Sequence, residues 1–239
     1  MTEPLSGWDL IARHLGGDAV AAFERMPPGD ERNLGLAAAL LSKYPQTKGN
    51  VARAAQLLET IIEGKGPPMF RSLALYLRAR IEHAFREGRR QDAIHYYQQL
   101  RNDYPDSLLA DNAAVKLALI EIERIGLAGS DAEVRSMIAR LMPPRGSHAQ
   151  GQYYYVVGSF FIERGDAQPA LENLLKVRDL DTLVGRNRAD VLVQIGRLSA
   201  QLGQVELART AYLEFLESNP LDPRHLMVSD LLAQMEESL

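Results

Sequence analysis

A few residues in the sequence have types and spacings that could support catalysis, and each lacks a part that the chemistry needs. Gly64-Lys65 resembles part of a phosphate-binding loop, which needs a glycine five positions earlier and a hydroxyl residue after the lysine. Glu59 and Gly66 occupy those two positions. Ser159 follows a glycine, but the strand–turn–helix pattern of a nucleophilic serine does not surround it. We therefore expect neither a nucleotide-phosphate loop nor a catalytic serine.

The histidines and carboxylates offer few metal ligands at useful spacings. The histidines are His14, His83, His95, His148 and His225, and no two of them have a zinc-binding spacing. His83 and His95, with Glu82, could form a metal or small-molecule site if their helices pack together. We favour ordinary surface or packing histidines, because a metal site needs converging ligands and a second shell. Asp179 and Asp181 begin like a calcium loop but lack its glycine and terminal glutamate.

Composition narrows the function classes further. The chain has 239 residues and no cysteine, which excludes disulfides, a thiol nucleophile and cysteine-type zinc sites. A formal net charge of -4 and a pI near 5.8 disfavour a nucleic-acid partner, which usually requires a basic face. No apolar run approaches the roughly 18–20 residues of a membrane span. We expect no cofactor and no catalytic activity.

The segment Ala189–Pro220 contains the clearest structural pattern. Its first apolar residues recur at spacings of three and four, which places them on one face of a helix. They are Val191, Leu192, Ile195, Leu198 and Leu202. Gly203 interrupts the run as a helix end would, and a second stripe follows up to Pro220, which cannot continue a helix. The segment therefore predicts two helices, and the small residues Gly196 and Ala208 indicate a close crossing between them.

The pattern recurs along the chain with a period of about 38 residues. Prolines mark the period at Pro27, Pro67, Pro105, Pro143 and Pro220. A glycine five residues before an alanine recurs in phase, at Gly49–Ala54, Gly88–Ala93, Gly165–Ala170 and Gly203–Ala208. Gly196, Ala208, Tyr212 and Pro220 fall on signature small, aromatic and proline positions, so their segment resembles a tetratricopeptide repeat (TPR). Leu192 stands where the motif has its first large aromatic residue.

The resemblance implies an all-α fold. We expect a TPR-like right-handed α-α superhelix, or solenoid, of about six helix pairs plus a C-terminal capping helix. We interpret residues 1–239 as a single domain. Its expected parts are a degenerate or capping pair at 1–28, repeats at 30–66, 68–105, 106–144, 147–182 and 185–220, and a capping helix at 223–237. Ser130 and Glu133 have the spacing of a capping box before a helix from residue 131.

The resemblance also implies a partner-binding groove. In TPR proteins the first helix of each pair lines the concave face, and its second, fifth, ninth and thirteenth positions often meet ligand. With Gly196 taken as the eighth position, the groove residues are Arg78, Glu82, Arg86, Tyr155, Ser159, Val193, Arg197 and Gln201. This set does not reproduce the Lys/Asn/Arg clamp that chaperone-binding TPR proteins use for a C-terminal carboxylate. For the aromatic run Tyr153-Tyr154-Tyr155 we favour packing between repeats over an anchoring role for Tyr155.

Four arginines near one repeat junction form a second candidate site. Arg178, Arg186, Arg188 and Arg197 could bind a carboxylate or phosphate through their paired donors. Three aspartates, Asp179, Asp181 and Asp190, lie among them in the sequence. We favour a solvated face in which these acids neutralise the arginines, because nearby opposite charges dilute the local field.

The string YPDSLLADNAAVKLA, residues 104–118, resembles the inter-repeat junction of bacterial envelope TPR proteins, such as the Tol-Pal partner protein. The N-terminal segment MTEPLSGWDL lacks the basic region and apolar core of an export signal. The sequence as it stands therefore predicts a cytoplasmic location, or a periplasmic one if an export signal has been removed.

Three functions follow from these features. The first is a non-catalytic protein–protein interaction scaffold that binds a peptide or partner protein in the concave groove. The second is the periplasmic portion of a bacterial envelope assembly protein. The third is a small-molecule-binding or enzymatic solenoid that uses the region of His83, His95 and Glu82. Self-association into a homo-oligomer is compatible with each of them, because solenoid ends and grooves can dock on a second copy.

Overall fold

The computed structural model describes residues 5–85 and 90–237, and within these ranges it contains thirteen α-helices and no strands. The helices pack sequentially along the chain, which confirms the prediction of an all-α, TPR-like solenoid of six helix pairs and a terminal helix. The chain forms two compact units, Met1–Ala113 and Ala114–Leu239, and the division falls within α7. We describe each unit by itself.

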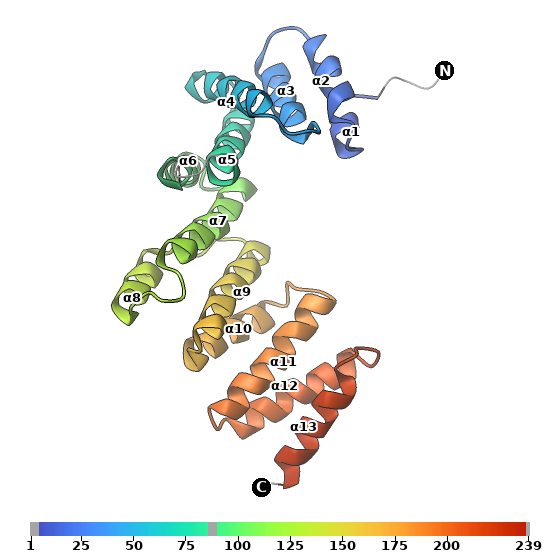
Figure 1. Cartoon of the computed structure of the whole chain (residues 1–239), viewed down its shortest axis with the longest axis vertical. Helices are drawn as coiled ribbons and strands as arrows, with labels where there is room; N and C mark the ends of the chain where they lie inside the picture. Colours follow the sequence, from blue (N-terminus) through green and yellow to red (C-terminus); the bar gives the residue numbers. More distant parts are fainter. Residues whose placement is uncertain (1–4, 86–89, 238–239) are drawn as a thin grey trace. The chain divides into compact units, whose positions relative to one another are not determined.

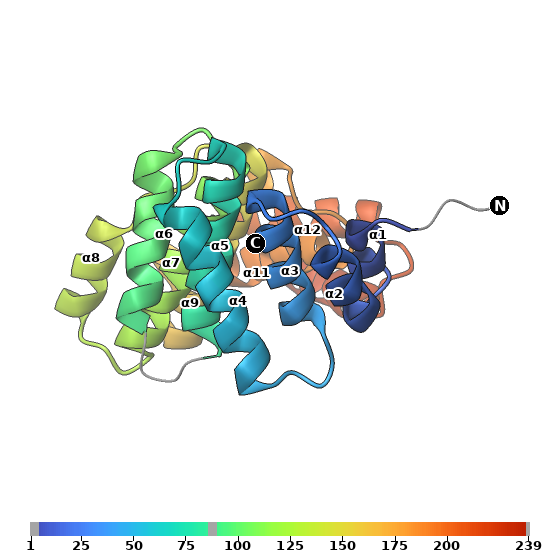
Figure 2. The same ribbon diagram turned by 90° about the horizontal axis from the view of Figure 1, so that it is seen from above.

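Within its described residues, 5–85 and 90–113, the first unit contains six helices, which Figures 1 and 2 show as successive neighbours. They are α1 (Gly7–Ala12), α2 (Gly16–Glu24), α3 (Asp30–Ser42), α4 (Lys48–Glu63), α5 (Pro68–Ala84) and α6 (Arg90–Asp103). Each helix from α1 to α5 packs against the next one, and α3 also contacts α1 and α5. Contacts between alternate helices of this kind are what stacked helix pairs produce.

The second unit comprises the end of α7 and six further helices. The bounds are α7 (Leu108–Ile125), α8 (Asp131–Arg140), α9 (Ser147–Arg164), α10 (Ala167–Leu180), α11 (Arg186–Gln201), α12 (Val205–Ser218) and α13 (His225–Glu237). From α9 to α13 each helix packs on the next, as Figure 1 shows. One core cluster centres on Phe160, Leu171 and Leu174, and a second joins Leu192 and Phe215 to Val228 of α13. The last helix therefore covers apolar side chains of α11 and α12.

Local sequence signals set several of the helix ends. The Ser130 side chain accepts a hydrogen bond from the Glu133 amide, and the Glu133 carboxylate accepts one from the Ser130 amide at 2.8 Å, which confirms the predicted capping box. Gly165 ends α9 with a φ of 83°, a left-handed conformation that side chains disfavour and glycine adopts freely. The chain can therefore turn sharply from α9 into α10.

The crossing of α11 and α12 depends on Gly196. A Cβ atom built on Gly196 would lie 2.2 Å from a ring carbon of Tyr212, which is buried on α12. Ala208, on the same helix as Tyr212, is also fully buried. The predicted close crossing is therefore confirmed, and it leaves no room for a larger side chain at Gly196.

Within residues 5–85 and 90–237, none of the helices combines the length and apolar character that a membrane crossing needs.

Candidate functional site

Two of the predicted groove residues, Arg78 and Glu82, lie inside the first unit. The Arg78 guanidinium is an ion-pair partner of Glu82 one turn along α5, and its Nε donates to Glu59 Oε2 of α4 at 3.1 Å. Tyr96 of α6 donates to the same Glu59 oxygen at 3.0 Å, and its ring lies 4.9 Å from the Arg78 guanidinium carbon. The side chains of Arg78 and Glu82 are only 12% and 1% exposed. The cluster thus links three helices, and a partner would have to compete with these contacts.

The interval between the end of α5 and the start of α6 explains this placement. Five residues separate α5 from α6, whereas three separate α11 from α12. Counted from the ends of α5 and α11, Arg80 is equivalent to Arg197, and both are exposed. Glu82 is equivalent to Ser199 by the same count, and both are buried. Arg80 is therefore the α5 residue that corresponds to Arg197, and the phase carried over from Gly196 did not identify it. Arg86 lies outside the described residues.

The remaining predicted groove residues lie on α9 and α11 of the second unit. Tyr155 is half-buried and packs against the core cluster around Phe160, and Ser159 one turn further is half-buried as well. Val193 is buried in the cluster that includes α13. Arg197 is exposed, donating to Gln194 at 3.4 Å, and Gln201 is also exposed. Two of these five side chains are thus exposed, and the role of the set in partner binding stays a prediction.

The arginines at the repeat junction pair mostly with acids. Arg178 binds Asp179 at 3.0 Å, and Arg188 binds both Glu214 at 2.9 Å and Asp181 at 3.4 Å. The side chain of Arg186 lies outside the description. Arg178 and Arg188 are therefore neutralised by nearby acids, whereas Arg197 contacts the uncharged Gln194. This pairing agrees with the interpretation of a solvated face.

The described residues include no group of three or more His, Asp or Glu side chains arranged to hold a metal ion.

An open apolar groove lies between α8 and α10, with α9 beneath it. We name it the α8–α10 groove. It has a volume of about 610 Å³ and is lined by Asp131, Val134, Arg135, Ile138, Ala139, Phe161, Asp166, Ala167, Gln168 and Pro169. Val134 and Phe161 are buried, Ile138 is half-buried, and these side chains form an apolar floor. Such a concave apolar surface with a few polar groups is typical of ligand and peptide sites.

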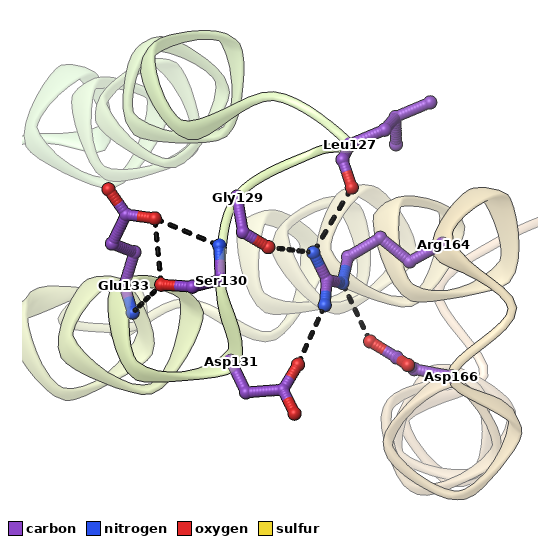
Figure 3. Close-up of polar contacts among 7 residues, drawn as sticks. All are labelled: Leu127, Gly129, Ser130, Asp131, Glu133, Arg164 and Asp166. Carbon is purple, nitrogen blue, oxygen red and sulfur yellow. Dashed lines mark hydrogen bonds and ion pairs between the residues drawn. The ribbon is translucent and has the colours of Figure 1, made fainter.

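Arg164 lies at one end of the groove, and Figure 3 shows its polar contacts with Leu127, Gly129, Asp131 and Asp166. Its Nη1 donates to the carbonyl oxygens of Leu127 at 3.1 Å and Gly129 at 2.6 Å in the turn before α8. Its Nη2 donates to Asp131 at 3.0 Å, and its Nε donates to Asp166 at 2.7 Å. The hydrogen bond to Asp166, together with the negative charges of Asp166 and Asp131, raises the pKa of Arg164. One guanidinium therefore fixes the start of α8 relative to the start of α10.

The two acidic groups of the groove have an ion-pair partner, whereas its one arginine has none in the described chain. Asp131 and Asp166 share Arg164, so their negative charge is largely compensated. Arg135 is exposed on the α8 wall, and it makes no ion pair or hydrogen bond with any part of the chain that the structure describes. The groove therefore offers an apolar floor beside one available guanidinium, an arrangement suited to binding rather than to bond-making chemistry.

The comparisons with known proteins agree with this fold. The sequence model of the tetratricopeptide repeat matches residues 73–107 and 190–222, and the first match is the longer. No curated protein matches the chain significantly. The crystal structure of the C-terminal part of a TPR repeat-containing protein from Cytophaga hutchinsonii has a similar fold, with a TM-score of 0.60 and 13% identity over 90% of this chain and 78% of that one. The two matched segments are therefore tetratricopeptide repeats, and the chain has a TPR-like fold.

Proposed function

We propose that this protein is a non-catalytic scaffold that binds a segment of a partner protein in the α8–α10 groove. TPR repeats generally mediate protein–protein interactions. The observation that carries the proposal is the combination of an apolar floor, made by Val134, Ile138 and Phe161, with the available guanidinium of Arg135. Two helices flanking an apolar channel suit a short amphipathic segment laid between them.

The charges of the groove define the partner segment. An uncompensated Arg135 favours a carboxylate, because a charge-assisted hydrogen bond to guanidinium is stronger than a neutral one. Asp131 and Asp166 already accept from Arg164, so they attract a basic residue less strongly. We therefore infer a segment with at least two large apolar side chains and an acidic residue beside them.

The contacts of Arg164 also support binding. Arg164 ties the turn before α8 to Asp166, the residue that precedes α10, so the two walls are held in place before a partner arrives. A site that is already ordered loses less conformational entropy on binding than a flexible one. The groove is thus preorganised at the end where both helices begin.

The concave positions predicted from the repeat phase form a second candidate surface for the same function. In the second unit these predicted positions are Tyr155, Ser159, Val193, Arg197 and Gln201, of which Val193 is buried. This face is more polar than the α8–α10 groove. The experiment below includes a variant on it, so the two surfaces can be told apart.

The experiment pans a phage-displayed library of random 12-residue peptides on the purified protein and titrates the enriched peptides by fluorescence anisotropy. Ala139→Arg fills the groove from an exposed position, and Arg135→Glu reverses its charge. Ala132→Arg is the matched control, because Ala132 is exposed on the same helix and does not line the groove. Arg197→Glu tests the concave face.

We expect the enriched peptides to combine apolar and acidic residues. Ala139→Arg and Arg135→Glu should each weaken binding at least tenfold, which corresponds to about 1.4 kcal/mol. Ala132→Arg should leave the affinity within about twofold of the wild type, a change under 0.5 kcal/mol. If Arg197→Glu alone abolishes binding, the partner uses the concave face. If no peptide is enriched, or none of the variants alters binding, the proposed function fails.

A further inference from the structure

The α8 wall of the α8–α10 groove has the residue spacing of a helix-packing face. Its lining residues are Asp131, Val134, Arg135, Ile138 and Ala139, so successive members are three, one, three and one positions apart. Residues at these spacings form one continuous stripe along a helix, and a helix uses such a stripe to pack on another helix. Asp131, Arg135 and Ala139 are exposed, so the described chain covers this stripe only in part.

The opposite wall of the groove is formed only by the start of α10. Its lining residues are Ala167, Gln168 and Pro169, and Asp166 directly precedes them. The α8 stripe extends from residue 131 to residue 139, which is about 12 Å along the helix axis. The open part of the stripe therefore matches about two turns of an added helix in length.

The walls of the groove offer no strand edge to a bound segment. Residues 5–85 and 90–237 contain no strands, and the backbone groups of α8 and α10 are paired within each helix except at the helix ends. An extended segment on the apolar floor would leave part of its own N–H and C=O groups unpaired, which is unfavourable away from water. A helix pairs these groups internally. The groove therefore favours a helical segment over an extended one.

The position of Arg135 determines where a bound helix needs an acidic residue. Arg135 follows Val134 directly and precedes Ile138 by three positions, so it lies beside the apolar floor on the α8 side. An acidic side chain that meets Arg135 must therefore flank the apolar stripe of the bound helix. Residues three or four positions apart share a helix face, so an acidic residue three positions after one apolar residue and four before another meets this condition.

We propose that the partner segment is an amphipathic helix of about two to three turns. Large apolar residues at positions i, i+4 and i+7 cover the groove floor, and an acidic residue at i+3 accepts hydrogen bonds from Arg135. This inference rests on the proposed function, because it names the conformation and residue pattern of the segment that the α8–α10 groove binds. It goes beyond that function because it excludes an extended segment and fixes the acidic position.

Synthetic, fluorescein-labelled 14-residue peptides test the pattern by fluorescence anisotropy. The first peptide has an alanine-rich background, leucines at i, i+4 and i+7, and a glutamate at i+3. A matched control peptide has the same composition, with the glutamate moved to i+2 on the opposite face of the helix. A third peptide has proline at i+5, on the solvent side, where it breaks the helix without removing a contact. The first peptide should bind at least tenfold more tightly than the other two.

Charge exchange tests the contact with Arg135. Arg135→Glu should weaken binding of the glutamate peptide at least tenfold, and a peptide with lysine at i+3 should bind Arg135→Glu more tightly than the wild type. This reversal requires that the two side chains meet, because a loss of structure in the variant would weaken both peptides. Ala132→Arg, exposed on the same helix outside the groove, should change neither affinity by more than about twofold.

The conformation of a bound library peptide separates this inference from the proposed function. NMR spectra of the tightest peptide from the random library, isotope-labelled and bound to the full chain, should show helical contacts between successive amide protons. If that peptide is extended while Ala139→Arg still weakens its binding, the proposed function stands and the helical partner is overturned. Equal binding of the i+3 and i+2 glutamate peptides also overturns the inference. If no peptide binds, the proposed function fails, and this inference fails with it.

Discussion

Replacing Gly196 by alanine should destabilise the protein, although alanine is the better helix former. Gly196 lies inside α11, where it faces Tyr212 of α12. The added methyl group would lie 2.2, 2.5 and 2.7 Å from three ring carbons of Tyr212. Real Cβ atoms do not approach carbon so closely, and a buried aromatic ring cannot rotate away as a flexible side chain could. The two helices must therefore separate locally.

The size of the effect is a difference between two opposing contributions. Overpacking a buried contact costs about 1–3 kcal/mol. Exchanging glycine for alanine in a helix recovers about 0.5–1 kcal/mol. The net loss should be about 1–2 kcal/mol. For a chain of this length, each kcal/mol lowers the melting temperature by about 2–4 °C, so a decrease of about 2–8 °C is expected.

Two other glycines provide graded controls in the same assay, thermal and urea unfolding followed by circular dichroism. Gly49 lies in the first turn of α4, and the nearest atom to an added Cβ is 3.9 Å away. Gly49→Ala should therefore stabilise the protein slightly. Gly158 on α9 would meet Leu174 Cδ2 at 3.0 Å, a flexible end that can shift, so Gly158→Ala should have an effect between the two.

A double-mutant cycle isolates the contact. If the clash with Tyr212 causes the loss, Gly196→Ala should cost less stability in a Tyr212→Leu background than in the wild type. The reasoning is refuted if Gly196→Ala is as stable as the wild type, or if its cost is unchanged in the Tyr212→Leu background.

Two further predictions concern buried and capping groups. The Tyr97 hydroxyl is buried without a hydrogen-bond partner in the described part of the chain, so Tyr97→Phe should stabilise the protein by about 1 kcal/mol in urea unfolding. Burial raises the pKa of Tyr97 in the folded protein. The free energy of unfolding is therefore at its full value below the pKa of the unfolded state, near 10, and decreases as the pH rises above that value. Tyr97→Phe should therefore reduce the alkaline loss of stability, and an unchanged alkaline profile would contradict the assignment. Hydrogen bonds from the Ser130 amide and hydroxyl lower the pKa of Glu133, so the capping box stabilises the fold above the unfolded pKa and loses this effect as the pH falls through the folded value. In Ser130→Ala, carboxyl NMR titration should show the Glu133 pKa moving upward, and no movement would argue against the capping box.

Features that depend on neighbouring residues could be predicted from the sequence. The capping box at Ser130 and Glu133 is set by residues three positions apart. The close crossing at Gly196 follows from small residues at fixed positions within one repeat. Both signals are local, and the period of the repeat extends them along the chain. This is why the all-α solenoid and its helix pairs could be predicted.

Features that depend on the interval between helices were harder to predict. Arg78 and Glu82 were assigned to the groove by a phase carried over from Gly196, and the longer interval between α5 and α6 shifts that phase by two residues. The signal that could have corrected it is Ala79, a fully buried small residue equivalent to Gly196 when helix ends are aligned. A shift of two positions along the helix moves a side chain to a different face, and this places Arg78 and Glu82 towards the interior.

The α8–α10 groove could not be predicted, because no local pattern sets the distance between helices of different pairs. Its position depends on Arg164, whose partners Leu127, Gly129 and Asp131 lie 33–37 positions away in the chain. An arginine at a helix end gives no sign in the sequence of which distant carbonyl groups it will meet. Only the folded chain shows that it holds the walls of a groove.

The most direct test of the central claim is hydrogen–deuterium exchange with and without the tightest peptide from the random 12-residue library. If the partner segment binds in the α8–α10 groove, backbone amides of α8, residues 131–140, and of the first turn of α10 should exchange more slowly in the complex. The same peptide should give no such protection in the Ala139→Arg variant. Protection confined to the concave face of α11, residues 193–201, with α8 unchanged, would contradict the claim.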